Sequence, residues 1–330
     1  MMELTFAQSF SLIALNAQDS IHLTTAKKAA LRCMSASVIL ELYLDKQFNV
    51  NSEDLTFTKE DLSNPSINLY QETILKIILG RNDSISDTLS NYLSHVIKLS
   101  NKQLKEIERT LADSLKGIDA LEEIPNLLGC DLEFKTAGVS IKEYRSNGEL
   151  YTKITEGLRA EILEDGVMSE EAILMLWLMR ESGSIYDIFS KEELKIVADR
   201  INQLFEENSF ARQIFSINIH KSIEIAIKNF LNIKKSIMST QIGTGVNFAF
   251  PFFERSQSIF IDTEAMFENK EERLRDVKVR LEQYGHTFTV IREGEVPLIK
   301  IDNFLYEAIP TAMNYQFPVQ GVRLRRYPIY

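Results

Sequence analysis

Residues 29–44 read AALRCMSASVILELYL, a run of helix-forming residues in which only Arg32 and Glu41 carry a charge. Apolar side chains fall on nearly every face of this predicted helix, and a helix that is apolar all round is a buried helix. The run is shorter than the roughly 20 apolar residues needed to cross a bilayer. We therefore expect it to form the centre of a soluble helical domain, with the other helices packed around it.

Length and charge limit what can be proposed for the chain. It has 330 residues, of which 45% are hydrophobic and only 7 are proline. Length divided by about 150 predicts two domains. The formal net charge of −10 disfavours general binding to nucleic acid or to anionic membranes, although a local basic patch could still bind an anion. We expect no nucleic-acid partner.

The cysteines and the N-terminus predict a cytoplasmic protein. Cys33 and Cys130 have neither a metal-binding spacing nor the number needed for a disulfide framework, which fits a reducing compartment. The N-terminal residues MMELTFAQSF lack the positive charge and apolar run of a signal peptide, and no later stretch reaches transmembrane length. Peripheral attachment to a membrane surface remains an open alternative.

Helical spacing of apolar residues dominates the chain up to about residue 235. The central helix should begin at a cap on Thr24 or Thr25 and run to about Lys46. The other predicted helices span about residues 4–17, 61–80 with Asn68 as a possible cap, 84–99, 101–120, a stretch from 156 that includes 172–180, 191–206 and 215–233. The stretch at 172–180 is nearly all apolar and holds Trp177, which we expect in the core.

Two β hairpins interrupt this helical pattern. The first joins short strands at 48–50 and 55–58 around Asn51 to Asp54. In the second, residues 130–154 alternate between apolar and polar, with Gly138 and Asn147-Gly148 as turns. Asn-Gly between alternating runs is a strong hairpin signal.

The composition changes near residue 236 and predicts a domain boundary. Residues 236–258 are rich in Ser, Thr, Gly and Phe, as in a linker or docking segment. The remainder predicts a small α+β unit, with strands at 258–263, 286–293, 296–302 and 304–309, a helix at 269–284 closed by Gly285, and turns at Glu293-Gly294 and Asp302-Asn303. We expect a helical domain over 1–235 that folds alone, and a small α+β domain over 259–330.

No catalytic, cofactor-binding or metal-binding constellation is recognisable. The histidines have no metal-ligand spacing with one another or with cysteine, and they are His22, His95, His220 and His286. Gly243-Thr-Gly245 lacks the remaining residues of a phosphate-binding loop. Glu41 is the one carboxylate expected to be buried, and a structural hydrogen bond is favoured over catalysis. We expect a protein that is not an enzyme and needs no cofactor or metal.

The C-terminal tail carries Arg323, Arg325 and Arg326 among tyrosines. Such a group could contact nucleic acid or a phosphate. A solvated or partner-facing end is the favoured interpretation.

The order of segments resembles the Golgi phosphoprotein 3 family over roughly residues 5–235. The resemblance rests on the collinear order of the buried helix ending in LELYL, then FNV, LTFT, QETILKII, LKEIERTLADSLKG, a β hairpin and AILMLWLMRESGSIYDIF. It implies a mostly helical domain around the central helix, with a protruding hairpin. It also implies a non-enzymatic peripheral membrane or adaptor protein that binds phosphatidylinositol 4-phosphate and protein cargo.

The headgroup positions implied by the resemblance fall on Ala26, Ser35, Lys105 and Glu108, and only Lys105 is basic. We therefore expect no strong selectivity for that lipid. A displaced cluster could replace these positions, because basic residues recur within two turns of the central helix and at i, i+3 and i+7 on a later helix. These candidates for binding an anion or lipid headgroup are Lys27, Lys28, Arg32, Lys102, Lys105 and Arg109.

Two further alternatives remain open. The basic residues could simply form solvated helix faces. The protein could also be an enzyme or ligand-binding module with its site in the C-terminal α+β unit or in the cleft between the domains. If the chain is a peripheral membrane or adaptor protein, its partners are anionic lipid headgroups, protein cargo or a second copy of the chain.

Overall fold

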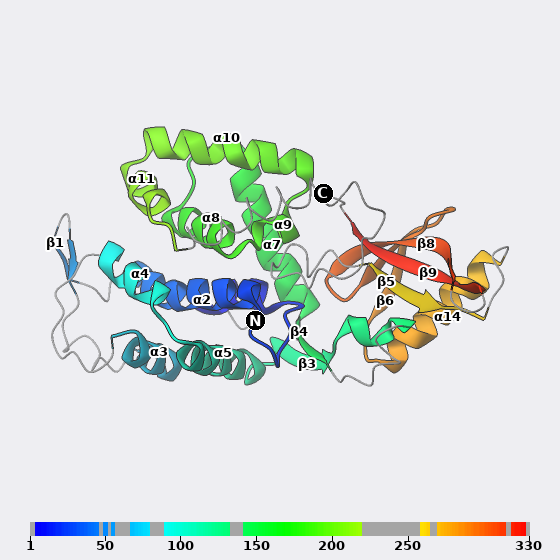
Figure 1. Cartoon of the computed structure of the whole chain (residues 1–330). Helices are drawn as coiled ribbons and strands as arrows, with labels where there is room; N and C mark the ends of the chain where they lie inside the picture. Colours follow the sequence, from blue (N-terminus) through cyan, green and yellow to red (C-terminus); the bar gives the residue numbers. More distant parts are fainter. Residues whose placement is uncertain are drawn as a thin grey trace. The chain divides into compact units, whose positions relative to one another are not determined.

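The computed structural model describes residues 4–45, 49–51, 54–56, 67–79, 89–132, 141–219, 258–264, 269–314 and 318–327 (Figure 1). Within them the chain is mainly helical and ends in an antiparallel β sheet, which confirms the predicted fold class at this level. Contacts divide the chain into two units. The first unit comprises Met1–Ala14, Leu23–Ile118 and Ile154–Pro251, and the second comprises Leu15–His22, Asp119–Lys153 and Phe252–Tyr330.

This division is not the contiguous one expected from the sequence. Residues 15–22 and 119–153, which the composition places in the helical domain, group with the C-terminal sheet. The segment 236–257 predicted as a linker lies outside the described residues, so the predicted boundary stays a prediction.

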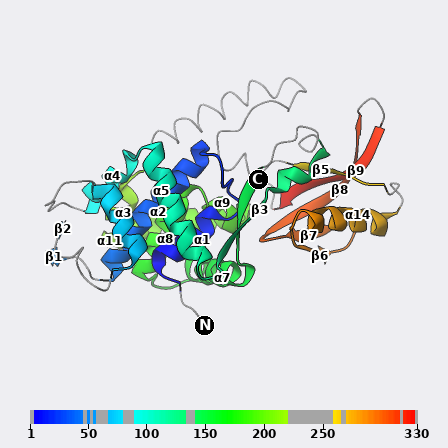
Figure 2. The same cartoon turned by 90° about the horizontal axis from the view of Figure 1, so that it is seen from below.

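The first unit is built around helix α2, Thr25–Leu44, the helix expected from residues 29–44. The Thr24 hydroxyl caps it by accepting a hydrogen bond from the amide of Lys27. Most of its side chains are buried, and it contacts α3, α4, α5 and α8 (Figure 2). Other helices of the first unit, including those that contact α2, are α1 (Phe6–Leu15), α3 (Leu69–Leu79), α4 (Leu89–Ile97), α5 (Asn101–Lys116), α8 (Glu170–Ser182), α9 (Ile185–Ile188), α10 (Lys191–Glu207) and α11 (Ser209–Ser216).

Glu41 ties three of these helices together. Its side chain is buried, and its carboxylate accepts hydrogen bonds from the Ala7 amide at 2.6 Å, from the Tyr70 hydroxyl at 2.5 Å and from the Gln71 side-chain amide. Burial and the Glu41 charge raise the pKa of Tyr70, so this hydroxyl stays a donor. The expected structural role of Glu41 is confirmed.

Trp177 is fully buried on α8, as expected, and its indole N–H donates to the carbonyl of Ile217 at 3.1 Å. Serine caps fix the starts of two helices that follow loops. Ser169 accepts from the amide of Ala172 at the start of α8, and Ser190 forms a reciprocal capping box with Glu193 at the start of α10. The short strands β1 (Asn49–Asn51) and β2 (Asp54–Thr56) pair antiparallel, which confirms the first predicted hairpin.

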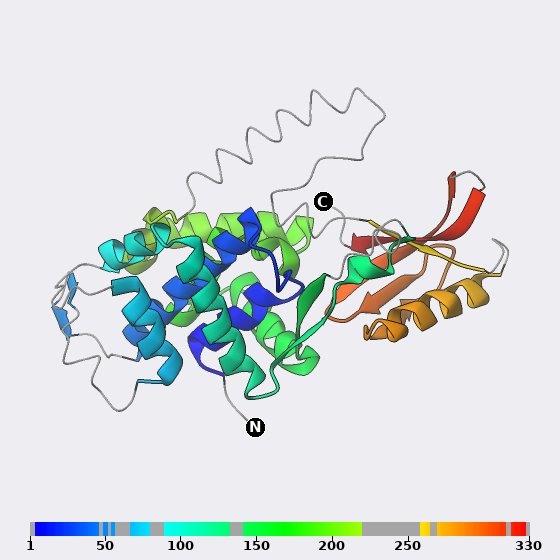
Figure 3. The same cartoon turned by 60° about the horizontal axis from the view of Figure 1, so that its bottom comes forward.

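The second unit contains two antiparallel sheets. Strand β3 (Leu121–Pro125) pairs with β4 (Lys142–Ser146), and the short 3-10 helix η2 (Leu127–Cys130) follows β3. The larger sheet has the order β5-β9-β8-β7-β6. Its strands are β5 (Ile259–Asp262), β6 (Phe288–Arg292), β7 (Leu298–Ile301), β8 (Phe304–Asn314) and β9 (Pro318–Tyr327). Helix α14 (Lys270–Gln283) packs against this sheet (Figure 3).

Strand β9 corrects the prediction for the C-terminal tail. Residues 318–327 form an inner strand between β5 and β8 and not a solvated end. Gly321 permits the pairing with β5, because a Cβ there would lie 2.3 Å from the carbonyl oxygen of Ile261. Strands β5 and β9 are far apart in the sequence. Their pairing therefore leaves no local signal in the sequence except the alternation of apolar and polar residues.

The prediction of a hairpin turn at Asn147-Gly148 is wrong. Helix α7, Gly148–Leu163, begins there, and the side-chain Oδ1 of Asn147 accepts from the amides of Glu149 and Leu150 at 3.1 and 3.2 Å. Asn147 therefore caps a helix. The partner of β4 is the preceding strand β3, and Gly138 lies outside the described residues.

Two predicted helices also end differently. The helix expected over 101–120 stops at Lys116, and Leu121 already belongs to β3. The helix expected over 215–233 is replaced in its first part by α11, which ends at Ser216, and its residues from 220 lie outside the described part.

Candidate functional sites

Lys27 does not belong to an exposed basic cluster. Its side chain is 1% exposed, and its ammonium lies 2.5 Å from the carboxylate of Glu108 on α5, which is 6% exposed. This buried ion pair joins α2 to α5 and neutralises both charges. The same pair removes Glu108 as a source of repulsion for a phosphate.

Lys28 and Arg32 are half-buried on α2. The Arg32 Nε atom is buried and has no hydrogen-bond partner among the described residues, and burial lowers the pKa of Arg32. The first predicted cluster, on α2, is therefore a weaker candidate for binding an anion, because Lys27 is already paired and the other two side chains are half-buried.

Lys102, Lys105 and Arg109 lie exposed on one face of α5, as the spacing predicts. The opposite face buries Leu104, Ile107, Leu111 and Leu115 in the core. The structure thus brings the second predicted cluster together on one surface.

Arg109 also lines a cavity of about 720 Å³ in the first unit. Residues of α3 and α5, which lie side by side in Figure 3, form much of its wall, together with residues at the start of α1. The lining residues are Thr5, Gln8, Asn68, Leu69, Tyr70, Thr73, Arg109, Thr110, Asp113, Ser114 and Ile118. Arg109 is the one basic residue in this described lining, which also contains hydroxyl and amide side chains but exposes mostly apolar surface. The sequence could not reveal this cavity, because its walls come from three separate helices.

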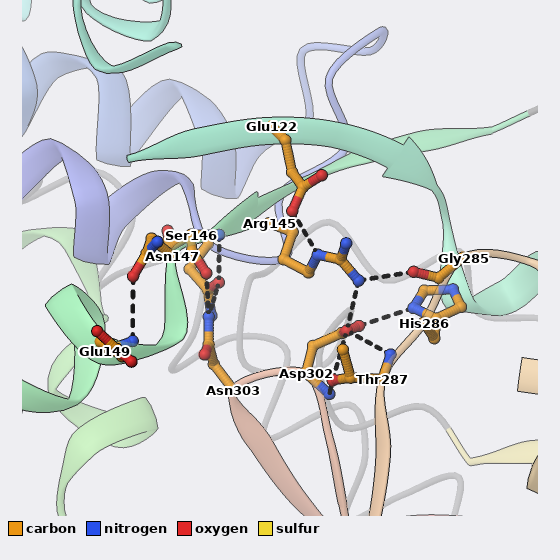
Figure 4. Close-up of polar contacts among 11 residues, drawn as sticks. Glu122, Arg145, Ser146, Asn147, Glu149, Gly285, His286, Thr287, Asp302 and Asn303 are labelled. Carbon is orange, nitrogen blue, oxygen red and sulfur yellow. Dashed lines mark hydrogen bonds and ion pairs between the residues drawn. The ribbon is translucent and has the colours of Figure 1, made fainter. Parts of the chain in front are cut away.

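A second polar site lies in the second unit, around the two-residue turn between β7 and β8 (Figure 4). The turn at Asp302-Asn303 was predicted, and Asp302 adopts a positive φ of 51° there. Arg145 on β4 lies between two carboxylates, with its guanidinium 3.0 Å from Asp302 and 2.8 Å from Glu122. It also donates to the carbonyl of Gly285 at 2.6 Å.

Asp302 binds different partners with its two oxygens. Oδ1 accepts from Arg145 and from the amide and hydroxyl of Thr287, at 3.0 to 3.1 Å. Oδ2 lies 2.7 Å from Nδ1 of His286. Burial alone would raise the pKa of Asp302, but the hydrogen bonds and charge of His286, with help from Thr287 and Arg145, hold it below its ordinary value. Asp302 is therefore a fixed anion.

His286 and Glu143 complete a buried group with Asp302. The His286 side chain has no exposed surface, and its Nε2 atom is buried without a hydrogen-bond partner among the described residues. Burial raises the pKa of Glu143 on β4 to about 8, and the charge of Asp302 adds to this. One oxygen of each carboxylate and one ring nitrogen of His286 all lie within 4.8 Å of one another.

Asn303 anchors the same turn to β4. Its side-chain amide donates to the Oδ1 of Asn16 at 2.9 Å and to the carbonyl of Ser146 at 2.8 Å (Figure 4). Asn16 also accepts from the amide of Ser146 at 3.2 Å. Both turn residues therefore hold β4 near His286.

The remaining sequence candidates form no further metal-binding group among the described residues. His22 is exposed and pairs with Asp19 at 2.8 Å, His95 lies on α4, and His220 and Gly243-Thr-Gly245 are outside the described residues. Both cysteines are buried, and burial raises the pKa of Cys130 to about 12.

The three tail arginines are held by the sheet. Arg323 donates to the Ser258 hydroxyl at 2.9 Å, Arg325 pairs with Glu307 at 2.7 Å, and the Arg326 guanidinium lies 3.6 Å from the ring centroid of Phe304. These contacts account for their positions without nucleic acid or phosphate.

Among the described helices, none combines the length and apolar character needed to cross a membrane. Comparison of the sequence with protein-family models gives no match, and comparison with curated proteins gives none either. The fold thus defines a mainly helical protein with a C-terminal antiparallel sheet. Its two candidate sites are the cavity at Arg109 and the buried polar group at Asp302.

Proposed function

We propose that this chain is a non-enzymatic peripheral membrane or adaptor protein, of the kind found in the Golgi phosphoprotein 3 family, that binds anionic lipid headgroups at the Arg109 cavity. The observation that carries the proposal is the placement of one exposed guanidinium among hydroxyl and amide side chains in a single cavity. Protein cargo or a second copy of the chain would be further partners of such an adaptor.

The cavity suits a phosphorylated polyol chemically. A guanidinium binds phosphate through paired, charge-assisted hydrogen bonds. The hydroxyls of Thr73, Thr110 and Ser114 donate to carbonyls of their own helices and can still accept from ring hydroxyls. Its volume of about 720 Å³ lies within the range of small-molecule pockets. Lys105 and Lys102, one and two turns before Arg109, extend the positive face of α5 beyond the cavity.

Leu69 offers a contact with the apolar part of a membrane. It lines the same cavity and is 79% exposed, which is unusual for a leucine at the start of a helix that otherwise buries its apolar residues. An apolar side chain beside basic residues is the arrangement by which peripheral proteins combine insertion with attraction to anionic lipid. Leu69 would supply the apolar contact of such a membrane site.

Headgroup selectivity should be weak. Asp113 contributes a carboxylate to the cavity that holds Arg109, and Lys102 and Lys105 are not among its lining residues. Binding should therefore depend mainly on surface charge and fall as salt screens it. We expect phosphatidylinositol 4-phosphate to bind no better than other anionic lipids at equal membrane charge.

Co-sedimentation with liposomes tests the proposal. Vesicles of neutral lipid are compared with vesicles that contain phosphatidylserine or phosphatidylinositol 4-phosphate at matched charge. Arg109→Gln should weaken binding to the anionic vesicles about fivefold, because one basic residue near such a surface contributes about 1 kcal/mol. The triple change of Lys102, Lys105 and Arg109 to glutamine should abolish measurable binding, while the melting temperature stays nearly constant because the side chains are exposed.

Lys195→Gln is the matched control. Lys195 is exposed on α10, on the other side of the first unit from α5, and its loss changes the net charge by the same amount (Figure 1). Equal losses in Arg109→Gln and Lys195→Gln would contradict a site at the cavity. Strong, salt-resistant selectivity for phosphatidylinositol 4-phosphate would contradict the expected weak specificity.

A ligand-binding module in the second unit is the second candidate function. The observation that favours it is the buried group of Glu143, His286 and Asp302, held by Arg145 and Thr287. Such a concentration of ionisable groups in one buried place is more common at functional sites than elsewhere.

A further inference from the structure

The ligand class that fits this buried group follows from its geometry. One oxygen from Glu143, one oxygen from Asp302 and one ring nitrogen of His286 lie within 4.8 Å of one another. Ligand atoms at about 2.0 to 2.2 Å from one tetrahedral ion lie about 3.3 to 3.6 Å apart, so binding an ion requires these side chains to close in by up to about 1.5 Å. We propose that Glu143, His286 and Asp302 bind a divalent transition-metal ion, with Zn²⁺ or Mn²⁺ as the class of ion.

The donor set decides between kinds of cation. Imidazole nitrogen with carboxylate oxygens suits Zn²⁺, Mn²⁺ or Fe²⁺, whereas Mg²⁺ and Ca²⁺ prefer all-oxygen sites. Three protein ligands leave at least one coordination position for water or another small ligand. This pattern is typical of open sites and not of closed structural zinc sites with four protein ligands.

The surrounding hydrogen bonds orient the carboxylate of Asp302. Three donors, from Arg145 and Thr287, occupy Oδ1, so Oδ2 is the oxygen left to face His286. Outer hydrogen bonds of this kind hold metal-binding carboxylates in position and are a regular part of metal sites. Metal ligands must be deprotonated, so any proton that these side chains hold would pass to solvent when the ion binds.

The unpartnered Nε2 of His286 is a second, independent observation. A buried polar atom without a partner costs free energy unless a water molecule or ion satisfies it. His286 therefore contains a buried ring nitrogen whose hydrogen-bonding capacity the described residues leave unused. The Asp302 side chain keeps 13% exposure, which leaves a route from solvent.

The rival interpretation is a purely structural network of Arg145, Asp302 and His286. The two interpretations differ in a measurable way. The full-length protein is stripped with a chelator, dialysed into metal-free buffer and titrated with Zn²⁺, Mn²⁺, Mg²⁺ and Ca²⁺ by isothermal calorimetry. We expect one equivalent of Zn²⁺ or Mn²⁺ to bind, with release of protons seen as a dependence of the heat on the buffer, and much weaker binding of Mg²⁺ and Ca²⁺.

Two ligand variants and one control make the test specific. Glu143→Gln and His286→Gln should each weaken Zn²⁺ binding at least tenfold, because each removes a direct ligand. Glu122→Gln removes a carboxylate that contacts Arg145 but is not a ligand, and its binding should match the wild type. Glu143→Gln replaces a buried carboxyl by a neutral group of equal size. This variant therefore still tests the metal site if His286→Gln does not fold.

Visible absorption of added Co²⁺ gives a second readout that does not depend on stability. A coordinated spectrum that Glu143→Gln abolishes would support the site. Absence of saturable binding by Zn²⁺ and Mn²⁺, or equal affinity in Glu143→Gln and the wild type, would overturn the proposal.

Discussion

The buried pair of Lys27 and Glu108 gives both residues a structural role that the sequence does not indicate. In the sequence both residues look like parts of a charged helix surface, but packing of α2 against α5 buries them together. A buried ion pair is costly to desolvate and is held in place because each charge needs the other. Lys27 is thus a structural residue and not a lipid ligand.

We predict that Lys27→Met destabilises the protein by about 3–5 kcal/mol, because it leaves the Glu108 carboxylate buried without its cation. The double variant Lys27→Met/Glu108→Leu should recover most of this loss, since two apolar side chains can replace a buried pair. Urea unfolding of the two variants measures the difference. A single variant as stable as the wild type would mean that Glu108 finds another partner.

At the scale of elements, the start of α10 combines a capping box with a contact to another helix. The Glu193 carboxylate accepts from the Ser190 amide at 2.7 Å and from the Arg159 guanidinium at 2.6 and 3.1 Å. Burial alone would raise the pKa of Glu193, but the bonds from Ser190 and Arg159 lower it below the ordinary value of 4.5. Glu193 therefore stabilises the folded state when ionised.

The sign of the pH dependence follows from this lowered pKa. The contribution of Glu193 is fully present well above pH 4.5, where the unfolded carboxyl is also ionised, and is lost as the pH falls through the lowered folded-state pKa. We predict that Glu193→Gln costs about 1 kcal/mol at neutral pH and progressively less as the pH falls through the lowered folded-state pKa. Thermal melts across this range should show the two curves converging.

Glu192→Gln serves as the control for that experiment. Glu192 is exposed in the same first turn and feels the same helix dipole. If both variants show the same pH dependence, the effect belongs to the helix dipole and not to Arg159.

At the scale of the whole molecule, each of the two units is built from segments that alternate along the sequence, and this affects how the chain folds. Residues 119–153 group with the C-terminal sheet, and Arg145 and Ser146 within them bond to Asp302 and Asn303. A chain ending near residue 235 would lose those partners while keeping α2 and α8. The helical core and the β4 network should therefore differ in their dependence on the C-terminal residues.

We predict that limited proteolysis cuts between residues 236 and 258. A fragment ending near residue 235 should be soluble, helical by circular dichroism and cooperative on melting, but less stable than the full chain because Arg145, Ser146 and Asn16 lose their partners. An unfolded or aggregated fragment would show that the two parts share one core. A fragment as stable as the full chain would show that the β4 contacts contribute nothing measurable.

Several features could be predicted from the sequence because their physical causes are local. The burial of α2 and α8 follows from apolar residues on all faces, and the Thr24 cap and the Asp302-Asn303 turn follow from neighbouring residues. The basic face of α5 likewise follows from helical spacing alone. Asn147-Gly148 shows the limit of such reasoning, because the same dipeptide suits a hairpin turn and a helix cap.

Only the tertiary structure decided which distant residues meet. Arg145 and Asp302 are 157 positions apart, yet they share a hydrogen bond, and Glu143 joins them from the strand that carries Arg145. β9 entered the sheet for the same kind of reason, since strand order depends on long-range pairing and not on local pattern. The sequence by itself determined the two buried helices, the Thr24 cap and the Asp302-Asn303 turn. Packing determined the Lys27–Glu108 pair, the Arg109 cavity and the buried group at His286. Each is assembled from elements that are separated in the sequence, so the sequence pattern does not indicate that they are in contact.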